Sequence, residues 1–90
     1  MNNLGLAYRA RKLTYGTTNV IKSIRDGSAK LIIIARDASD NTKKKITDKC
    51  KYYDIPFKIE FISAEISNAI GKKNIMVVSI LDSGFKEMLL

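Results

Sequence analysis

Hydrophobic and polar positions along the chain follow two kinds of spacing. Apolar residues three and four positions apart predict helices over residues 2–11, 17–26, 42–53, 64–70 and 84–90. Between them, short runs rich in β-branched residues predict strands over residues 13–15, 30–35, 57–61 and 75–81. The run over residues 30–35 is the clearest, because its unbroken apolar stretch is typical of a central strand buried on both faces.

The order of these elements predicts the fold class. Strands joined by helices of about 10–12 residues require crossover connections, which put helices on both faces of the sheet. The sequence therefore predicts an α/β fold, a three-layer α/β/α sandwich with a small, mixed, mainly parallel sheet of four strands. The expected core consists of apolar residues on these elements: Leu31, Ile33, Ile46, Cys50, Ile59, Ile70, Val77 and Ile80.

Polar residues and glycines predict where the helices begin and end. Gly16 breaks the chain before the second helix, and Gly71 ends the fourth. The side chains expected to cap helix starts are hydroxyl, amide or carboxylate groups close to the first helical position: Thr17 or Thr18, Asp40 or Asn41, and Ser63.

Length and charge add a constraint on size and partners. Ninety residues, 46% of them hydrophobic, are enough for one small globular domain, residues 1–90. The formal charge of +7 favours a polyanionic partner. Residues 1–45 hold ten basic and three acidic side chains, whereas residues 46–90 hold six of each. A face that binds anions must therefore be built mostly from the first half of the chain.

Missing residue types argue against an enzyme. The chain has no histidine, the usual general base near neutral pH, and its one cysteine, Cys50, cannot form an internal disulfide or a multi-thiolate metal site. We expect Cys50 to be a small buried hydrophobe, and we expect no catalytic activity, metal or other cofactor. Basic residues interrupt the apolar region that a signal peptide needs, and no apolar run approaches the ~20 residues of a membrane span. These features predict a reduced, cytoplasmic protein that does not bind membranes.

The most informative segment, GTTNVIK over residues 16–22, lies at a predicted loop-to-helix junction. The start of a helix exposes unpaired N–H groups, so a phosphate can bind there while Thr and Asn side chains reach base edges or sugar hydroxyls. Lys22 lies one turn further along and can add a phosphate contact. The alternative interpretation is an ordinary polar helix start with a solvated lysine.

Two other segments also have a functional and a structural interpretation. Arg36 and Asp37 follow the central strand, where open α/β sheets commonly bind ligands. Arg36 can hold a phosphate, and Asp37 can accept a hydrogen bond from a base or simply order the loop. The lysine-rich outer face of residues 42–53 can attract a partner of opposite charge, or it can be a solvated surface.

Four segments, GTTNVIK, KLIIIARDAS, DIPF and ISAEISNAIG, occur in this order over nearly the whole chain. Together they resemble the kink-turn RNA-binding ribosomal proteins, a family of the L-seven-Ae and L-thirty-e type. The run ASDNTKKKITDKCKYYDIP is similar to the bacterial branch of this family known as YlxQ. The resemblance implies a three-layer α/β/α fold that binds a sharply bent RNA internal loop.

The resemblance also implies which residues contact RNA. In such proteins a Gly-x-Asn-Glu-x-x-Lys helix start enters the major-groove side of tandem G·A pairs, and a short apolar loop covers a flipped nucleotide. The matching residues form a helix start, a strand-end loop and an apolar loop: Gly16, Thr17, Thr18, Asn19 and Lys22; Arg36 and Asp37; and Phe61, Ile62, Ser63, Ala64 and Glu65. Thr18 and Asn19 stand where the family pattern has Asn and Glu. We expect the three groups to lie on one surface.

These observations predict a non-catalytic, ribosomal-protein-like RNA-binding chain that acts as a monomer. Its expected partner is a kink-turn or similar structured RNA, ribosomal or messenger, with the ribosome as a further candidate. One alternative is a differently structured RNA to which the altered helix start is matched. The alternative from another class is a protein-interaction module whose basic helix, residues 42–53, docks on an acidic partner without specific RNA binding.

Overall fold

The computed structural model describes residues 3–90, which contain five helices and four strands. In chain order these are α1 (Asn3–Arg9), β1 (Leu13–Tyr15), α2 (Thr17–Arg25), β2 (Leu31–Ile34), α3 (Asp40–Tyr53), β3 (Phe57–Ile59), α4 (Ser63–Ile70), β4 (Val77–Ile80) and α5 (Ser83–Leu89). Every predicted helix and strand is confirmed, with ends that differ by at most two residues. Residue 2, which the pattern included in the first helix, lies outside the described residues.

The four strands form one mixed sheet in the order β1-β4-β2-β3. β2 pairs in parallel with β3, whereas β4 pairs antiparallel with both β1 and β2. The prediction of a mainly parallel sheet is therefore wrong, although the mixed sheet is confirmed. β1, β2 and β3 point in the same direction, but β4 runs against them between β1 and β2, because the chain leaves α4 at the end of the sheet where β2 and β3 finish.

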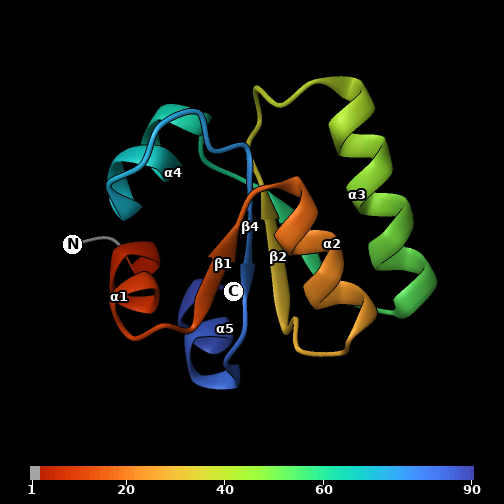
Figure 1. Ribbon diagram of the computed structural model, residues 1–90, viewed down its shortest axis with the longest axis horizontal. Helices are drawn as coiled ribbons and strands as arrows, with labels where there is room; N and C mark the ends of the chain where they lie inside the picture. The colour runs from red at the N-terminus through yellow and green to blue at the C-terminus, as the bar shows by residue number, and fades with distance from the viewer. Residues whose placement is uncertain (1–2) are drawn as a thin grey trace.

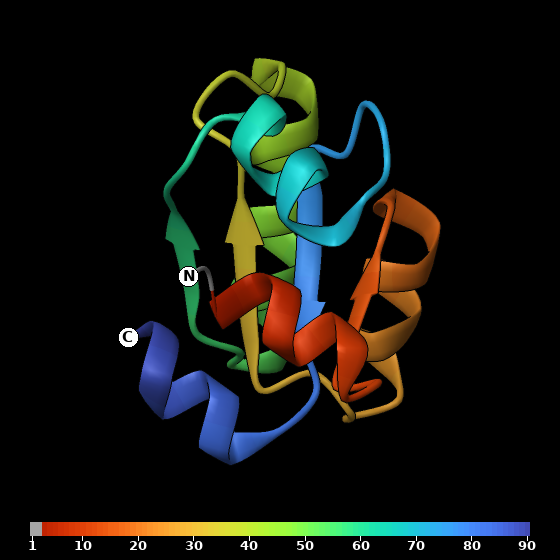
Figure 2. The same ribbon diagram turned by 90° about the vertical axis from the view of Figure 1, so that its left-hand side faces the viewer.

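Helices cover both faces of this sheet, which confirms the three-layer sandwich. α2 and α3 lie side by side on one face, and α1, α4 and α5 cover the other (Figures 1 and 2). The start of α2 and the loops after β2 and β3 all lie at one edge of the sheet, the upper edge in both views. They meet there because β1, β2 and β3 all end at that edge.

The starts of α3 and α4 differ from those expected, and so does that of α2, which is described with the candidate interface. α3 is capped by Ser39, whose hydroxyl accepts a hydrogen bond from the backbone N–H of Thr42 at 3.1 Å, so neither Asp40 nor Asn41 is the cap. Ser63 is the first residue of α4 rather than its cap. A cap needs extended backbone just before the helix. The sequence shows several polar candidates at each boundary but not which one has that backbone.

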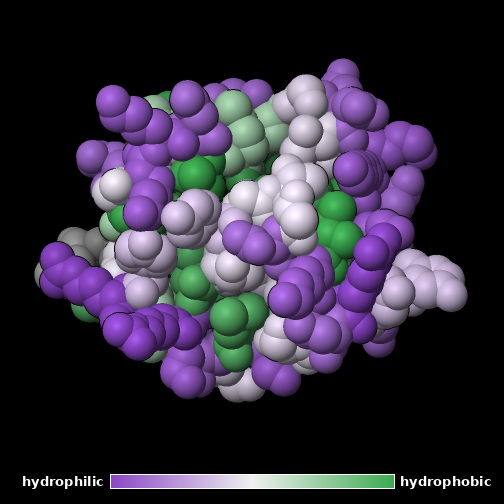
Figure 3. Space-filling model, in the orientation of Figure 1, coloured by the Kyte–Doolittle hydropathy of each residue, from purple (hydrophilic) through white to green (hydrophobic). Residues whose placement is uncertain are grey.

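The core lies between the sheet and its helices. All the predicted core residues except Ile59 are buried, namely Leu31, Ile33, Ile46, Cys50, Ile70, Val77 and Ile80. Ile59 is 45% exposed, because β3 is an edge strand with no neighbour on its outer side. Burial raises the pKa of the Cys50 thiol to about 11, which agrees with a structural rather than a nucleophilic role. On the face seen in Figure 3, hydrophilic residues predominate and apolar residues are visible among them.

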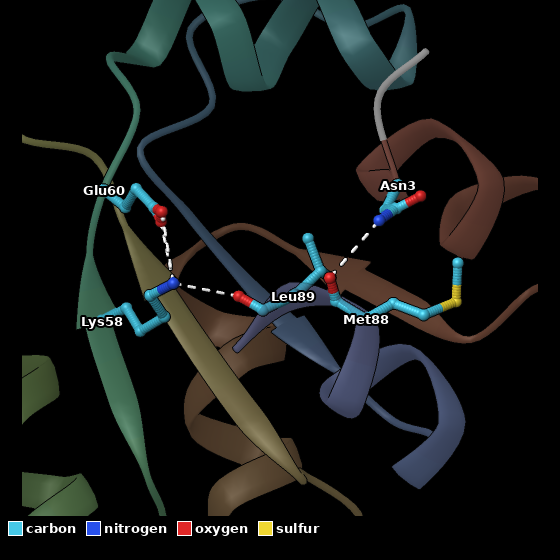
Figure 4. Close-up of polar contacts among 5 residues, drawn as sticks. All are labelled: Asn3, Lys58, Glu60, Met88 and Leu89. Atoms are coloured by element: carbon cyan, nitrogen blue, oxygen red, sulfur yellow. Dashed lines mark hydrogen bonds and ion pairs between the residues drawn. The ribbon is translucent and has the colours of Figure 1, made fainter.

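None of the residues of α5 is fully buried, although Phe85 and Leu89 pack against the core, and polar contacts hold its C-terminal end. Lys58 on β3 donates from Nζ to the carbonyl oxygen of Leu89 at 2.9 Å and also pairs with Glu60 at 2.9 Å (Figure 4). Asn3 on α1 donates from Nδ2 to the carbonyl oxygen of Met88 at 3.4 Å. A cation at the C-terminal end of a helix satisfies its unpaired carbonyls and opposes the negative end of its dipole.

α2 is fixed to the sheet by a buried pair of serines. The hydroxyls of Ser23 on α2 and Ser79 on β4 lie 2.8 Å apart and are hydrogen-bonded, and the Ser23 hydroxyl is also 2.7 Å from the carbonyl oxygen of Val20. Both serines are buried, and Val20 and Ile24 pack into the core beside them. A buried, satisfied polar pair tolerates few alternative positions of the helix.

α1 and α4 approach each other closely at Gly5. A β-carbon at this position would lie 2.9 Å from the backbone carbonyl oxygen of Ala69 on α4. Backbone atoms of a packed helix cannot move aside cheaply, so the glycine sets the distance between the two helices.

Gly5→Ala is expected to lower the free energy of unfolding by about 1–2 kcal/mol, because crowding outweighs the ~1 kcal/mol by which alanine favours a helix. Urea unfolding followed by circular dichroism measures this change. Gly84→Ala in α5 is the control, since the new methyl group would meet a side-chain oxygen, Oδ2 of Asp82 at 3.0 Å, rather than the backbone of a packed helix; because that oxygen accepts from the Phe85 N–H, a smaller loss is expected there. A gain in stability for Gly5→Ala would contradict the close contact.

Candidate nucleic-acid interface

Three segments far apart in the sequence meet where β1, β2 and β3 end. The strand-end loop and the apolar loop are joined directly, since the Arg36 N–H donates to the carbonyl oxygen of Phe61 at 2.8 Å. The helix start and the strand-end loop are joined through the start of β4. The Gly16 N–H donates to the carbonyl oxygen of Val77 at 3.1 Å, and the Ala35 N–H donates to that of Met76 at 2.8 Å. The expectation that the helix start, the strand-end loop and the apolar loop share one side of the molecule is confirmed. We call this surface the strand-end edge; it comprises residues 16–22, 35–39, 60–65 and 71–76.

The first turn of α2 receives no side-chain cap. Gly16 is the N-cap residue, with φ 88° and ψ 146°, a conformation that is open to glycine and costly for other residues. The expectation that Thr17 or Thr18 caps the helix is therefore wrong, because the residue with non-helical backbone at this boundary is a glycine without a side chain. The N–H groups of the first turn face the strand-end edge without a side-chain acceptor.

Thr18 and Asn19 lie on different sides of α2. Thr18 lines the groove between α2 and α3 together with Lys22. The Asn19 side chain lies against the end of β1, where its Nδ2 donates to the carbonyl oxygen of Tyr15 at 3.2 Å. One residue turns a helix by about 100°, so these two side chains cannot make the same contact with a ligand. Lys22 is exposed and borders both sides.

Asp37 links the strand-end loop to the start of α4. Its Oδ2 accepts a hydrogen bond from the Ser63 hydroxyl at 2.6 Å, and its Oδ1 accepts one from the Ser63 backbone N–H at 2.7 Å. These hydrogen bonds, the side-chain one foremost, hold the pKa of Asp37 below its usual value of 3.8. Of the two roles left open by the sequence, the structure shows the ordering of the loop. Arg36 beside it is exposed.

The apolar loop has a fixed and unusual backbone. Phe61 has φ 66°, in the left-handed region that bulky residues rarely adopt, and its side chain is half-buried against the core. Ile62 is 42% exposed, and its backbone N–H donates to Oε1 of Glu65 at 2.9 Å. Ala64 is also exposed. The loop therefore presents an apolar side chain to solvent from a constrained backbone.

The sequence analysis missed a basic turn beside the apolar loop. Lys72 and Lys73 line a hollow of about 390 Å³ next to Ser63 and Ala64. The turn is held by Ser67, whose buried hydroxyl accepts a hydrogen bond from the backbone N–H of Ile75 at 2.8 Å. The lysine pair after Gly71 was a visible signal, but the balanced charge of the second half of the chain concealed it.

The strand-end edge offers N–H, hydroxyl, amide and basic groups, the kinds of group that contact phosphates and bases. Among residues 3–90, no cluster of histidine, cysteine, aspartate or glutamate side chains could hold a metal ion. No helix within the same residues is long and apolar enough to cross a membrane.

The family model described as the ribosomal protein L7Ae/L30e/S12e/Gadd45 family matches residues 1–90. The chain belongs to this family. One relative, the RNA-binding protein YlxQ of Bacillus subtilis (strain 168), is 48% identical over 87 residues, which are 97% of this chain and 87% of the relative. The resemblance carried by the four sequence segments, including its YlxQ-like branch, is confirmed.

Two solved structures share the fold of this L7Ae/L30e/S12e/Gadd45 family member. A Bacillus halodurans protein of unknown function superposes with a TM-score of 0.92 and 41% identity over 97% of this chain and 88% of its own. The Giardia lamblia 15.5kD RNA binding protein superposes with a TM-score of 0.82 over 97% of this chain and 75% of its own. At 19% identity, the second likeness concerns the fold alone.

The names within the L7Ae/L30e/S12e/Gadd45 family bear on two of the expectations. The family is described as ribosomal, and the Bacillus subtilis relative is named as an RNA-binding protein rather than an enzyme. This agrees with the expectation that the chain is not an enzyme. The alternative of a protein-interaction module gains no support from these relatives.

Ser63→Ala is expected to raise the pKa of Asp37 toward 3.8 without reaching it, because one of the two hydrogen bonds from Ser63 is lost and the backbone N–H still donates. An NMR titration of the side-chain carboxyl carbon measures the shift. Because folding lowers this pKa, the link stabilises the fold above the ordinary carboxyl range, and its contribution is lost as the pH falls through the folded-state pKa.

Ser28→Ala is the matched control. Ser28 makes the same pair of contacts with Asp26, through its hydroxyl at 2.6 Å and its backbone N–H at 2.9 Å, and these hold the pKa of Asp26 low. This variant should raise the pKa of Asp26 and leave that of Asp37 unchanged. An unchanged Asp37 pKa in Ser63→Ala would rule out the hydrogen bond from the Ser63 hydroxyl to Asp37 in solution.

Proposed function

We propose that this chain binds structured RNA of the kink-turn type through the strand-end edge. The observation that carries the proposal is the meeting of an uncapped helix start, the Arg36 loop and an exposed apolar loop at one edge of the sheet. Membership of a ribosomal protein family, with a 48% identical relative named as an RNA-binding protein, supports the same conclusion. Groups that bind phosphate and an exposed apolar side chain together suit a bent RNA, which offers both backbone and unstacked bases.

The start of α2 enters a groove of the RNA. Its first-turn N–H groups and the positive end of the helix dipole attract phosphate or base acceptors, and the absence of a Gly16 side chain lets RNA approach the backbone. The hydroxyls of Thr17 and Thr18 can donate to base edges or accept from them. Asn19 retains its Oδ1 as an acceptor, because only its Nδ2 is engaged by Tyr15. Lys22 binds a phosphate and adds affinity that does not depend on sequence.

The two loops complete the interface. Arg36 binds a second phosphate, and Asp37 acts through Ser63 by fixing the apolar loop relative to that arginine. The exposed Ile62 packs on an unstacked base, in the manner by which proteins commonly recognise single-stranded RNA positions. Glu65 and the constrained Phe61 hold the loop in place, and Ala64 leaves the base room to approach.

We propose a ribosomal or messenger RNA as the partner, bound in the cytoplasm by residues 1–90 acting as one domain and as a monomer. The ribosomal character of the family supports a ribosomal RNA, with the ribosome as a further candidate partner.

The proposal is tested by titrating the chain against a kink-turn RNA and a regular duplex of equal length, at about 50 mM and about 200 mM salt. We expect tighter binding to the kink-turn RNA at both concentrations, and weaker binding to both RNAs at the higher one because phosphate contacts release counterions. Equal affinity for the two RNAs would remove the kink-turn claim. Absence of binding to either would remove RNA binding itself.

Two substitutions in α2 separate affinity from preference. Lys22→Ala is expected to weaken binding to both RNAs and to reduce the slope of log affinity against log salt by about one, because one phosphate contact is lost. Thr18→Ala should narrow the preference for the kink-turn RNA and leave the slope unchanged. Lys30→Ala, just before β2 at the opposite edge of the sheet, is the charge-matched control. If Lys22→Ala behaves like Lys30→Ala, the helix start does not face the RNA.

A further inference from the structure

A basic groove runs between α2 and α3 and begins at the strand-end edge, with which it shares Thr18 and Lys22. It has a volume of about 560 Å³ and is lined by Lys22 and Arg25 of α2 and by Lys45 and Lys49 of α3. In Figure 3, an apolar strip lies between hydrophilic residues in the region of these two helices. The half-buried Ile21 contributes to the apolar lining.

Helical spacing explains why these cations share the groove. Lys22 and Arg25 are three residues apart on α2, and Lys45 and Lys49 are four apart on α3, so each pair lies on one face of its helix. The two helices pack side by side and bring the two faces together (Figure 1). No run of neighbouring residues signals this cluster in the sequence.

The groove carries more positive charge than its surroundings neutralise. Its one acidic residue, Asp26, is already held by the hydroxyl and the backbone N–H of Ser28, which lower its pKa, with a further contribution from the charge of Lys22. Among the described residues, no ion pair involves any of the four cations. On another face of α3, by contrast, Lys44 pairs with Asp48 at 3.5 Å. Cations held close together without counter-charges favour a polyanion between them.

We propose that this groove binds the phosphate backbone of a duplex stem that flanks the RNA element held at the strand-end edge. The inference rests on the proposed function, because Thr18 and Lys22 belong both to the helix start and to the groove. A stem that leaves the helix start along α2 therefore passes directly between Arg25 and the two lysines of α3.

The dimensions and chemistry suit a backbone rather than bases. Residues 18–25 span about 10 Å of helix axis, enough to follow about three phosphates of one strand. The four cations donate hydrogen bonds and accept none, and they are carried by long flexible side chains that follow charge rather than base identity. The groove thus adds affinity that is independent of stem sequence, while the strand-end edge selects the RNA.

The test uses the double variant Lys45→Gln, Lys49→Gln, which removes two charges from the groove and leaves the helix start intact. Lys44→Gln, Lys51→Gln removes the same charge from exposed positions of α3 outside the groove. Both are titrated against a kink-turn RNA with two long stems, and against versions in which one stem or the other is cut to about four base pairs.

With long stems, the groove variant should bind roughly tenfold more weakly than the parent at 0.1 M salt, with a salt slope smaller by about two. The control variant should stay close to the parent. Cutting one of the two stems should abolish the difference between parent and groove variant, and Lys45→Arg, Lys49→Arg should restore parental binding.

The outcomes distinguish the two proposals. If the parent binds no RNA, the proposed function fails and the groove inference with it. If the parent binds the kink-turn RNA but the groove variant matches the control variant, the groove is not a stem-binding site and the proposed function stands. A defect of the groove variant that persists when either stem is cut would also overturn the inference.

Discussion

The direction of β4 is the constraint on which the rest of the arrangement depends. β4 runs against β1 and β2 while lying between them, so β1, β2 and β3 all end at one edge of the sheet and β4 begins there. At its start, the carbonyl oxygen of Val77 accepts a hydrogen bond from the Gly16 N–H. The carbonyl oxygen of Met76, just before the strand, accepts one from the Ala35 N–H on the other side. Those bonds tie the helix start to the strand-end loop. Without the reversed strand, the segments that form the candidate interface would have no common support.

Most of the helices and strands could be predicted from the sequence because buried residues recur at the spacing of each element. The unbroken apolar run of β2 corresponds to a strand whose four residues are all buried. α3 ends at Tyr53 and α4 ends before Gly71, as expected. The order of the strands in the sheet does not affect the local pattern, so the number of parallel strand pairs is smaller than the sequence predicts. The exposure of Ile59 depends on β3 lying at the edge of the sheet, which local pattern does not encode.

The candidate interface was predictable as a set of positions and not as a set of contacts. Local sequence is enough to indicate Gly16, which precedes a helix, and Arg36, which follows the central strand, as positions of a candidate interface. The bond between Asp37 and Ser63 joins residues separated by a helix and a strand, so no local spacing could indicate it. The basic groove depends likewise on how α2 and α3 are rotated about their axes. The resemblance to a known family predicted that the three segments share one surface, whereas the periodicity of the sequence could not predict this.

The left-handed backbone of Phe61 has a consequence for the energetics of recognition. A bulky residue at φ 66° is strained by about 1–2 kcal/mol, and such a conformation persists only when its surroundings leave no alternative. Here the Phe61 carbonyl is held by Arg36 and its ring by the core. The free energy of this strain is expended when the chain folds, so the loop already has its binding conformation before a ligand is present. Little conformational entropy then remains to be lost on association, and preorganisation of this kind slows dissociation more than it speeds encounter.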